Sequence, residues 1–276
     1  VYAWAQTFTP NCSERKMAMK QKGFSIESLH IIGCLLLVLN SLLFIFPGMT
    51  ISRPSDVPMT FSVVDKIWIF AFPIFAFLLV EEFHHTENFN KLAACILAFA
   101  IIFEIPFDLV QSRRPFEINL NNQFFTLFFG AVSLRILTGG WNPVFKFVGI
   151  AVLGVVCSVA DCEYGLCGIL LVVLFQLTRS LPLKCWLQLG GTLVLSWFCL
   201  RLSLRGWMSM IDPGYIPFFG GQFINAQYLC ALALIPISFC SLNRKAQRKM
   251  FLFVVYGSLP IAFLVIYLIR YFTMGL

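Results

Sequence analysis

The sequence predicts an all-α protein, a polytopic integral membrane helical bundle with about nine transmembrane helices. Hydrophobic residues make up 59% of the chain and charged residues 12%, and the mean hydropathy is +0.84. Soluble domains carry roughly 25% charged residues, so this chain lacks the polar surface of a soluble fold. The apolar residues form long continuous runs that do not alternate as barrel strands do, which favours helices as the membrane-spanning elements.

Nine apolar segments can be drawn along the chain, and turn residues such as Pro47-Gly48 and Gly139-Gly140 separate them. They cover residues 29–46, 67–80, 92–109, 124–137, 144–159, 166–177, 183–200, 226–240 and 251–272. No internal repeat and no linker divides them. We therefore expect a polar N-terminal segment over residues 1–25 and one transmembrane domain over residues 26–276.

The net charge of +7 indicates membrane surfaces rather than nucleic acid as the partner of the basic residues. Most of the 20 Lys and Arg residues fall on one side of the predicted topology, which predicts a cytoplasmic N-terminus. The cysteines show no metal-ligand spacing, so no metal site is expected. Cys162 and Cys167 flank a short connection and are spaced for a disulfide, but we interpret them as two thiols at membrane level.

The first polar cluster follows the second apolar segment. Glu81 and His85 are four residues apart, so on a continuing helix they share a face. A carboxylate beside an imidazole orients it and raises its basicity, as a general base requires. A solvated helix end with mixed charge explains the same residues without any function.

The second cluster lies inside the third apolar segment, where Glu104 and Asp108 flank Pro106. Buried carboxylates are costly in a membrane unless they are paired, so such residues indicate a functional site or a structural ion pair. Arg113 and Arg114 follow closely enough to pair with Asp108.

The third cluster combines Asn122 and Gln123, before the fourth segment, with Glu163 and Tyr164, before the sixth. The predicted topology brings both groups to the outer side of the membrane. Their polar side chains can hold a polar substrate, although amides before a helix also serve as simple helix caps.

Several blocks together resemble the TraX family, from about residue 26 to the C-terminus. They are the stretch AFPIFAFLLVE at residues 71–81, EIPFDL at 104–109, NQFFTL at 122–127, and Glu163-Tyr164-Gly165, which is similar to an Asp-Tyr-Gly motif of that family. TraX proteins are polytopic membrane proteins named for the acetylation of conjugative pilin, and they resemble membrane acyltransferases that use acyl-CoA.

The resemblance implies a bacterial inner-membrane acetyltransferase that takes acetyl-CoA from the cytoplasm and modifies an amine or hydroxyl acceptor. The acceptor would be a pilin N-terminus or a surface glycan. The implied catalytic residues are His85, Glu81, Glu104 and Asp108, and the implied substrate-binding residues are Asn122, Gln123, Glu163 and Tyr164. The basic run of Arg244, Lys245, Arg248 and Lys249 would attract the phosphates of acetyl-CoA, although a plain cytoplasmic loop is equally basic.

The sequence departs from the family pattern at three places. Asn40-Ser41 stands where the family has an Asp-His pair, Ile69 where it has an arginine, and Ala262 where the last segment has a histidine. A catalytically degenerate member that packs against neighbouring membrane subunits is therefore the alternative function. A transporter with Glu104 and Asp108 along an ion path ranks third, because no inverted repeat supports it.

Overall fold

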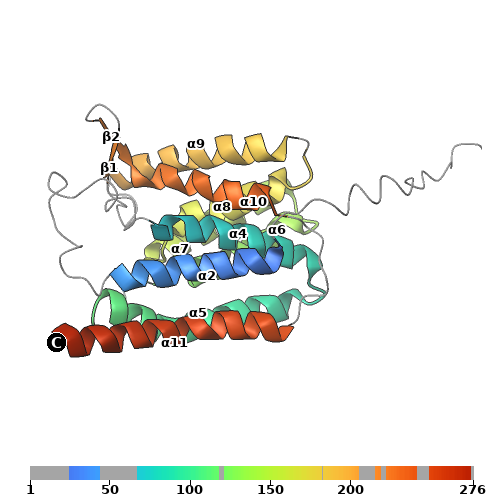
Figure 1. The fold of residues 1–276 in the computed structure, drawn as a ribbon. Coiled ribbons are helices and arrows are strands. Elements are labelled where there is room, and N and C mark those ends of the chain that lie inside the picture. Colours follow the sequence, from blue (N-terminus) through green and yellow to red (C-terminus); the bar gives the residue numbers. More distant parts are fainter. Residues whose placement is uncertain are drawn as a thin grey trace, which may run out of the picture.

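The computed structural model describes residues 25–43, 67–117, 121–181, 183–204, 215–218, 222–240 and 249–274. These residues form nine α-helices that lie alongside one another in a bundle (Figure 1). The helices are α2 (Ile26–Leu43), α4 (Ala71–His85), α5 (Phe89–Gln111), α6 (Gln123–Thr138), α7 (Pro143–Val159), α8 (Gly165–Thr178), α9 (Lys184–Leu204), α10 (Leu234–Ser238) and α11 (Lys249–Met274). Two 3₁₀ helices, η2 (Ile67–Phe70) and η4 (Ala226–Ala233), lead directly into α4 and α10.

Each of the nine predicted apolar segments coincides with helical structure, including the short α8. The expectation of nine full spans is met only in part, because within the described residues only α5 and residues 254–273 of α11 are both long and apolar enough to cross a membrane. Helix α8 has 14 residues and therefore a length of about 21 Å, shorter than the roughly 30 Å of a hydrocarbon core. The apolar helices indicate membrane association, and the number of complete spans remains a prediction.

Asparagine caps begin three consecutive helices. The side chains of Asn88, Asn122 and Asn142 accept hydrogen bonds from backbone amides in the first turns of α5, α6 and α7. An Asn side chain at this position satisfies an amide that the helix itself leaves unpaired. The polar residues between the apolar runs therefore determine where these helices start.

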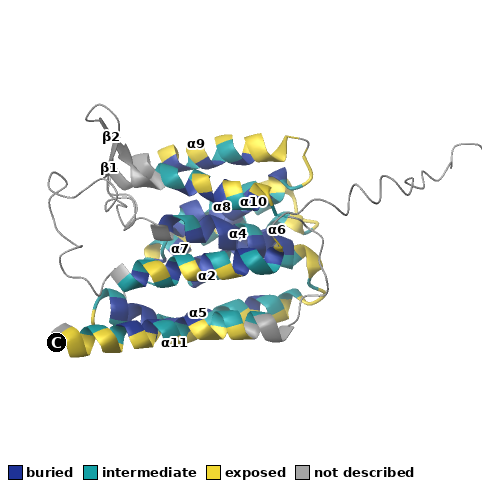
Figure 2. Cartoon of the chain, viewed as in Figure 1, coloured by how far each residue is buried: buried dark blue, intermediate teal, exposed yellow. Residues whose placement is uncertain are grey.

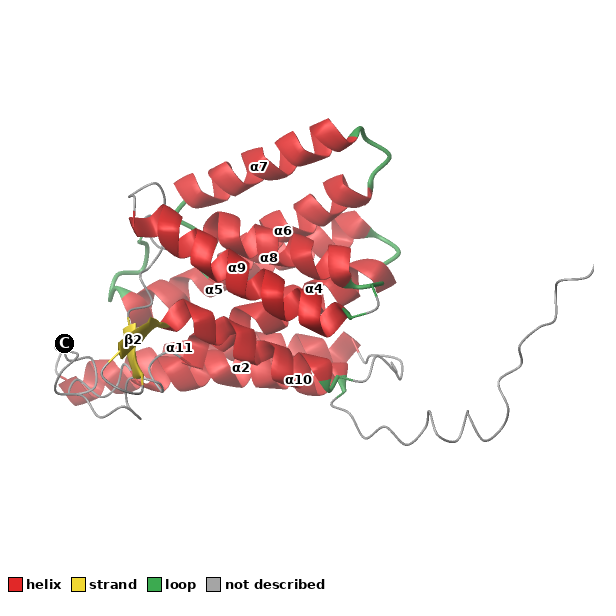
Figure 3. Cartoon of the chain, turned by 90° about the horizontal axis from the view of Figure 1, so that it is seen from above, coloured by secondary structure: helices red, strands yellow, loops and turns green. Residues whose placement is uncertain are grey.

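Helix α4 occupies the centre of the bundle and contacts α2, α6 and α8 (Figure 1). Helices α5 and α11 pack together on one side, and α9 and α10 lie on the other. Seen from above, α7 forms an outer edge beside α6 and α8 (Figure 3). Gly33 allows α2 to approach α4 closely, because a Cβ atom there would lie 2.9 Å from the Phe75 ring.

Aromatic side chains fill the interface between α4, α5, α6 and α11. The Phe99 and Phe124 rings meet edge to face with their centroids 4.6 Å apart, and the Phe103 and Phe263 rings do so at 4.7 Å. Edge-to-face pairs of this kind add about 0.5–1.5 kcal/mol beyond the area that they bury. The centre of the bundle is therefore packed with rings.

The outer surface is apolar over much of its area. Helix α4 is almost entirely buried, whereas α7 and α11 carry many exposed residues (Figure 2). On α7 the exposed side chains include Phe145, Phe147, Val152 and Val159. Soluble monomers rarely expose contiguous apolar patches larger than a few hundred Å², so this surface is suited to lipid or to another apolar surface.

Two features differ from the expectations. A short antiparallel hairpin, β1 (Tyr215–Phe218) paired with β2 (Gln222–Asn225), accompanies the helices. Cys162 is a free thiol, but Cys167 is disulfide-bonded, so the interpretation of both residues as thiols is wrong for Cys167. Because Cys162 is free, the disulfide does not join these two cysteines.

Candidate functional site

The first polar cluster lies where α4 ends, and we call it the Glu81 cluster (Glu81, His85 and Arg179). The Glu81 side chain is 1% exposed, and its two oxygens accept from Arg179, from Nε at 2.9 Å and from Nη2 at 3.2 Å. This forked ion pair raises the pKa of Arg179, so its guanidinium stays charged. The buried charge of Glu81 is thus compensated by a residue 98 positions away in the sequence.

His85 lies on the same face of α4 as Glu81, as their spacing predicts. Its Nε2 atom is 3.9 Å from Glu81 Oε2, and its side chain is 48% exposed. This separation is too long for a hydrogen bond, and Arg179 already occupies both carboxylate oxygens. The two residues therefore lie close together without forming the hydrogen-bonded pair that an activated base needs.

The second polar cluster, the Glu104 cluster (Glu104, Asn122, Gln123, Glu163 and Tyr164), lies where α6 begins. The Asn122 backbone amide donates to Glu104 Oε2 at 3.1 Å, and its side-chain Nδ2 donates to the same oxygen. That Nδ2 also donates to the Ala100 carbonyl oxygen at 2.9 Å, while Oδ1 accepts from the Phe124 amide at 2.9 Å. Asn122 therefore caps α6 and holds the carboxylate of α5 as well.

The turn between α7 and α8 brings Glu163 to this cluster. Tyr164 and Gly165 have positive φ angles of 68° and 41°, so the chain reverses within a few residues. The Glu163 amide donates to the Asn121 carbonyl oxygen at 2.9 Å, which fixes the turn against the residues that precede α6. The Tyr164 ring stacks on the ring of Phe72 with centroids 4.1 Å apart, which also attaches the turn to α4.

The electrostatic setting of Glu163 differs from that of an ordinary surface carboxylate. Burial raises the pKa of Glu163, the backbone amide of Gln123 lowers it by hydrogen bonding, and the nearby negative charge of Glu104 raises it, with a net pKa of about 8. A carboxyl group with this pKa exchanges its proton near neutral pH. It therefore suits general acid or base catalysis better than an ordinary glutamate does.

Gln123 is the first residue of α6 and is 1% exposed. Neither Oε1 nor Nε2 of its side chain has a hydrogen-bond partner within the described part of the chain. Buried polar atoms normally have partners, and an exception calls for an explanation. A bound polar group beside α6 would supply one.

Asp108 lies one helical turn beyond Glu104, and its expected ion pair with Arg113 or Arg114 does not form. Asp108 Oδ2 accepts instead from the Glu117 backbone amide at 2.8 Å. Arg113 has a φ angle of 62°, where the chain turns after α5, and Arg114 Nη1 lies 3.6 Å from a Glu117 carboxylate oxygen. Asp108 therefore anchors the segment after α5.

The structure does not bring the four predicted catalytic residues into one place. Glu104 and Asp108 lie near the start of α4, where Tyr164 stacks on Phe72, whereas Glu81 and His85 lie near its end. Glu81 lies nine positions after Phe72 on α4, which corresponds to about 14 Å along the helix axis. One reacting group cannot contact both clusters.

Four basic residues were predicted to attract acetyl-CoA. Three of them lie outside the described residues, namely Arg244, Lys245 and Arg248, and the fourth, Lys249, is the first residue of α11.

The sequence did not predict Arg179 as a site residue, although its position directly after an apolar run was a usable signal. In the structure His30 is 2% exposed, and its Nδ1 atom lies 2.7 Å from the Tyr256 hydroxyl oxygen on α11.

Comparison with known proteins agrees with the resemblance seen in the sequence. The family model described as TraX protein matches residues 25–270 of this chain. That range covers every α-helix listed above apart from the last turn of α11. No curated protein and no solved structure matches the chain.

Proposed function

The chain belongs to the TraX protein family, and on that premise we propose that it is a membrane acetyltransferase. It would transfer the acetyl group of acetyl-CoA to an amine or hydroxyl acceptor, such as the N-terminus of a pilin or a surface glycan. In this reaction the acceptor attacks the thioester carbonyl, the carbon–sulfur bond breaks, and CoA leaves as its thiol after gaining a proton. The reaction needs a base for the acceptor and donors for the oxyanion.

The observation that carries this proposal is the Glu104 cluster. It gathers carboxylates and amides from α5, from α6 and from the turn before α8, all within a family-matched chain. Glu163, with its pKa raised to about 8, is the group best suited to accept the proton of the acceptor. The unpartnered carboxamide of Gln123 can donate to the developing oxyanion.

The donor would approach from another direction. The side chains that define the Glu104 cluster are carboxylates, amides and a phenol, which suit an acceptor group but not the phosphates of CoA. The basic run at residues 244–249 retains its proposed role in attracting those phosphates. His85 with Glu81 remains the alternative position for the base.

The test is acetyl transfer by the purified full-length protein in detergent. Labelled acetyl-CoA would be supplied with peptides bearing free N-termini and with amino sugars, and transfer to one acceptor class is expected. Absence of transfer, together with absence of CoA binding by calorimetry, would exclude the enzyme function.

Two variants locate the base. Glu163→Gln should lower kcat by roughly 10²-fold or more, the usual contribution of a general base, while the matched exposed variant Glu87→Gln should leave it unchanged. Full loss in His85→Ala, with Glu163→Gln still active, would move the base to the Glu81 cluster.

A catalytically degenerate subunit is the second candidate function, and one observation favours it. Where the family resemblance leads us to expect an Asp-His pair and an arginine, Ser41 is 1% exposed and Ile69 is fully buried. The Ser41 hydroxyl donates to the Leu37 carbonyl oxygen of its own helix at 2.9 Å. These positions contribute to packing, and co-purification of stoichiometric membrane partners without CoA binding would support this function.

A further inference from the structure

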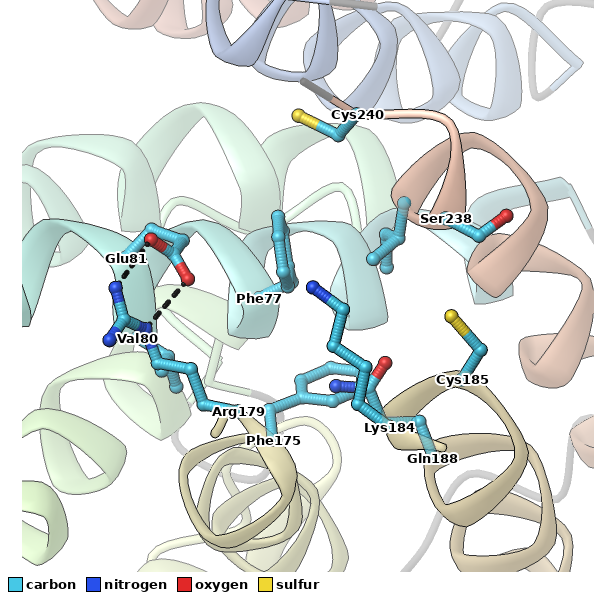
Figure 4. A pocket seen from close by; sticks show the side chains of 11 residues that line it. Phe77, Val80, Glu81, Phe175, Arg179, Lys184, Cys185, Gln188, Ser238 and Cys240 are labelled. Atoms are coloured by element: carbon cyan, nitrogen blue, oxygen red, sulfur yellow. Dashed lines mark hydrogen bonds and ion pairs between the residues drawn. The ribbon is translucent and has the colours of Figure 1, made fainter. Parts of the chain in front are cut away.

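A pocket of about 200 Å³ opens beside the Glu81 cluster, between the ends of α4 and α10 and the start of α9. We call it the α8–α9 pocket, because Phe175 of α8, Arg179 directly after it and residues of α9 line one side (Figure 4). Its apolar wall includes Phe77 and Phe175. Its polar and charged lining residues are Glu81, Arg179, Lys184, Gln188 and Ser238.

The charges in this pocket do not balance. Glu81 uses both carboxylate oxygens on Arg179, so this pair is neutral as a unit. Arg179 uses two of its five N–H donors in the pair with Glu81, so three N–H donors are left, and its side chain is 34% exposed. Lys184 is exposed and makes no ion pair within the described part of the chain, so one positive charge remains for a ligand.

Gln188 supplies a second, independent observation. It is 5% exposed, yet its carboxamide makes no hydrogen bond to any described residue. Lys184 and Gln188 are four residues apart and share a face of α9. Both side chains extend from α9 toward α4 in the close view (Figure 4). The Gln188 carboxamide borders the pocket beside the Lys184 ammonium, and both groups can donate hydrogen bonds to one acceptor group there.

We propose that the α8–α9 pocket binds a phosphate group. The lysine supplies a point charge, the arginine supplies N–H donors that the ion pair leaves over, and the glutamine supplies an amide donor. Whole small-molecule sites occupy roughly 300–1,000 Å³, so this pocket accommodates one phosphate-sized group and leaves the rest of its molecule outside. The phosphate belongs either to a lipid headgroup or to a soluble phosphorylated molecule, because both present the same chemistry to these donors.

The first experiment measures binding of inorganic pyrophosphate to the purified full-length protein by calorimetry in a neutral detergent. Lys184→Gln should weaken binding about tenfold or more, as the loss of one charge-assisted hydrogen bond predicts. Lys91→Gln is the matched control, because Lys91 is exposed, carries the same charge and lies in the first turn of α5, outside the pocket. Gln188→Leu should weaken binding as well, without changing any charge.

A second arm compares retention of phosphatidylglycerol and phosphatidylcholine by the same proteins in native mass spectrometry. A loss in Lys184→Gln that is confined to phosphatidylglycerol identifies a lipid headgroup, and a loss confined to pyrophosphate identifies a soluble ligand. If neither ligand depends on Lys184, or if Lys91→Gln weakens binding equally, the proposal is wrong. Neither arm contains an acetyl donor or acceptor, so the result is independent of acetyl transfer.

Discussion

Replacing Arg179 by glutamine removes the guanidinium that hydrogen-bonds both oxygens of buried Glu81 and leaves His85, whose Nε2 atom is 3.9 Å from that carboxylate, as the nearest basic group among the described residues. The guanidinium donates at 2.9 and 3.2 Å to a carboxylate that is 1% exposed. At an effective dielectric constant of about 20, two charges about 4 Å apart attract by about 4 kcal/mol. Removing one partner of a buried pair costs about 3–5 kcal/mol, because the other charge is left uncompensated.

We expect the lower end of that range, about 3 kcal/mol, because solvent screens the one third of the Arg179 side chain that is exposed. For a chain of this size, each kcal/mol shifts Tm by roughly 2–4 °C, so Arg179→Gln should lower Tm by about 6–12 °C. The assay is thermal unfolding in detergent, followed by circular dichroism.

A double-mutant cycle separates the pair from the arginine alone. Glu81→Gln combined with Arg179→Gln should recover most of the lost stability, since neither charge then remains buried. Arg114→Gln is the control, because Arg114 is 74% exposed and its pair with Glu117 should be worth at most about 1 kcal/mol. If Arg179→Gln shifts Tm no more than Arg114→Gln does, the buried-pair reasoning is refuted.

Three further predictions test the packing and the Glu104 cluster. Gly168→Val should destabilise the bundle by about 1–3 kcal/mol in detergent unfolding, because its Cβ would lie 2.6 Å from the Phe72 ring. Tyr256→Phe should cost about 1–2 kcal/mol in the same assay, since it removes the hydroxyl that bonds His30 at 2.7 Å. The pKa of Glu163 is about 8 in the fold against 4.5 ordinarily, so the folded state keeps a proton that the unfolded state releases, and stability should fall as pH rises through this window. Glu163→Gln should flatten that slope in unfolding curves recorded between about pH 5 and pH 8.

Each of these has a control or a contradicting outcome. A Cβ atom at Gly190 meets nothing within 4 Å, so Gly190→Ala should leave the stability of the bundle equal or slightly higher. If Gly190→Ala lowers stability as much as Gly168→Val does, the loss at Gly168 is not due to the close approach of Phe72. Unchanged stability in Tyr256→Phe would show that the contact with His30 contributes nothing to the fold. A pH slope that persists in Glu163→Gln would have to be assigned to another group.

The positions of the helices were predictable from the sequence, because they follow from the free energy of transferring each run of apolar residues out of water. A run of apolar residues is costly in water wherever it lies in the chain, and turn residues and asparagine caps mark its ends. Even α8, with only 14 residues, appears where its apolar run predicts it. Helix length relative to a membrane depends on the exact boundaries, which is why the number of complete spans was less predictable.

The partners of the polar residues were not predictable in the same way. The spacing of Glu81 and His85 correctly predicts a shared face, but the carboxylate pairs with Arg179, 98 residues later. In the same manner, His30 meets Tyr256 across 226 residues and so lies inside the bundle. Nothing in the local sequence carries that information.

Composition, apolar runs and family motifs by themselves determined an apolar helical protein of the TraX family and most of its polar candidates. The tertiary structure alone decided that Glu104, Asn122 and Glu163 meet at one end of the bundle, and that Glu81 and Arg179 meet at the other. The physical reason is that helix formation depends on neighbouring residues, whereas ion pairs and pockets depend on which helices pack together and in which rotation. Burial then selects the pairing, because a charge inside the bundle is stable only beside its compensating group.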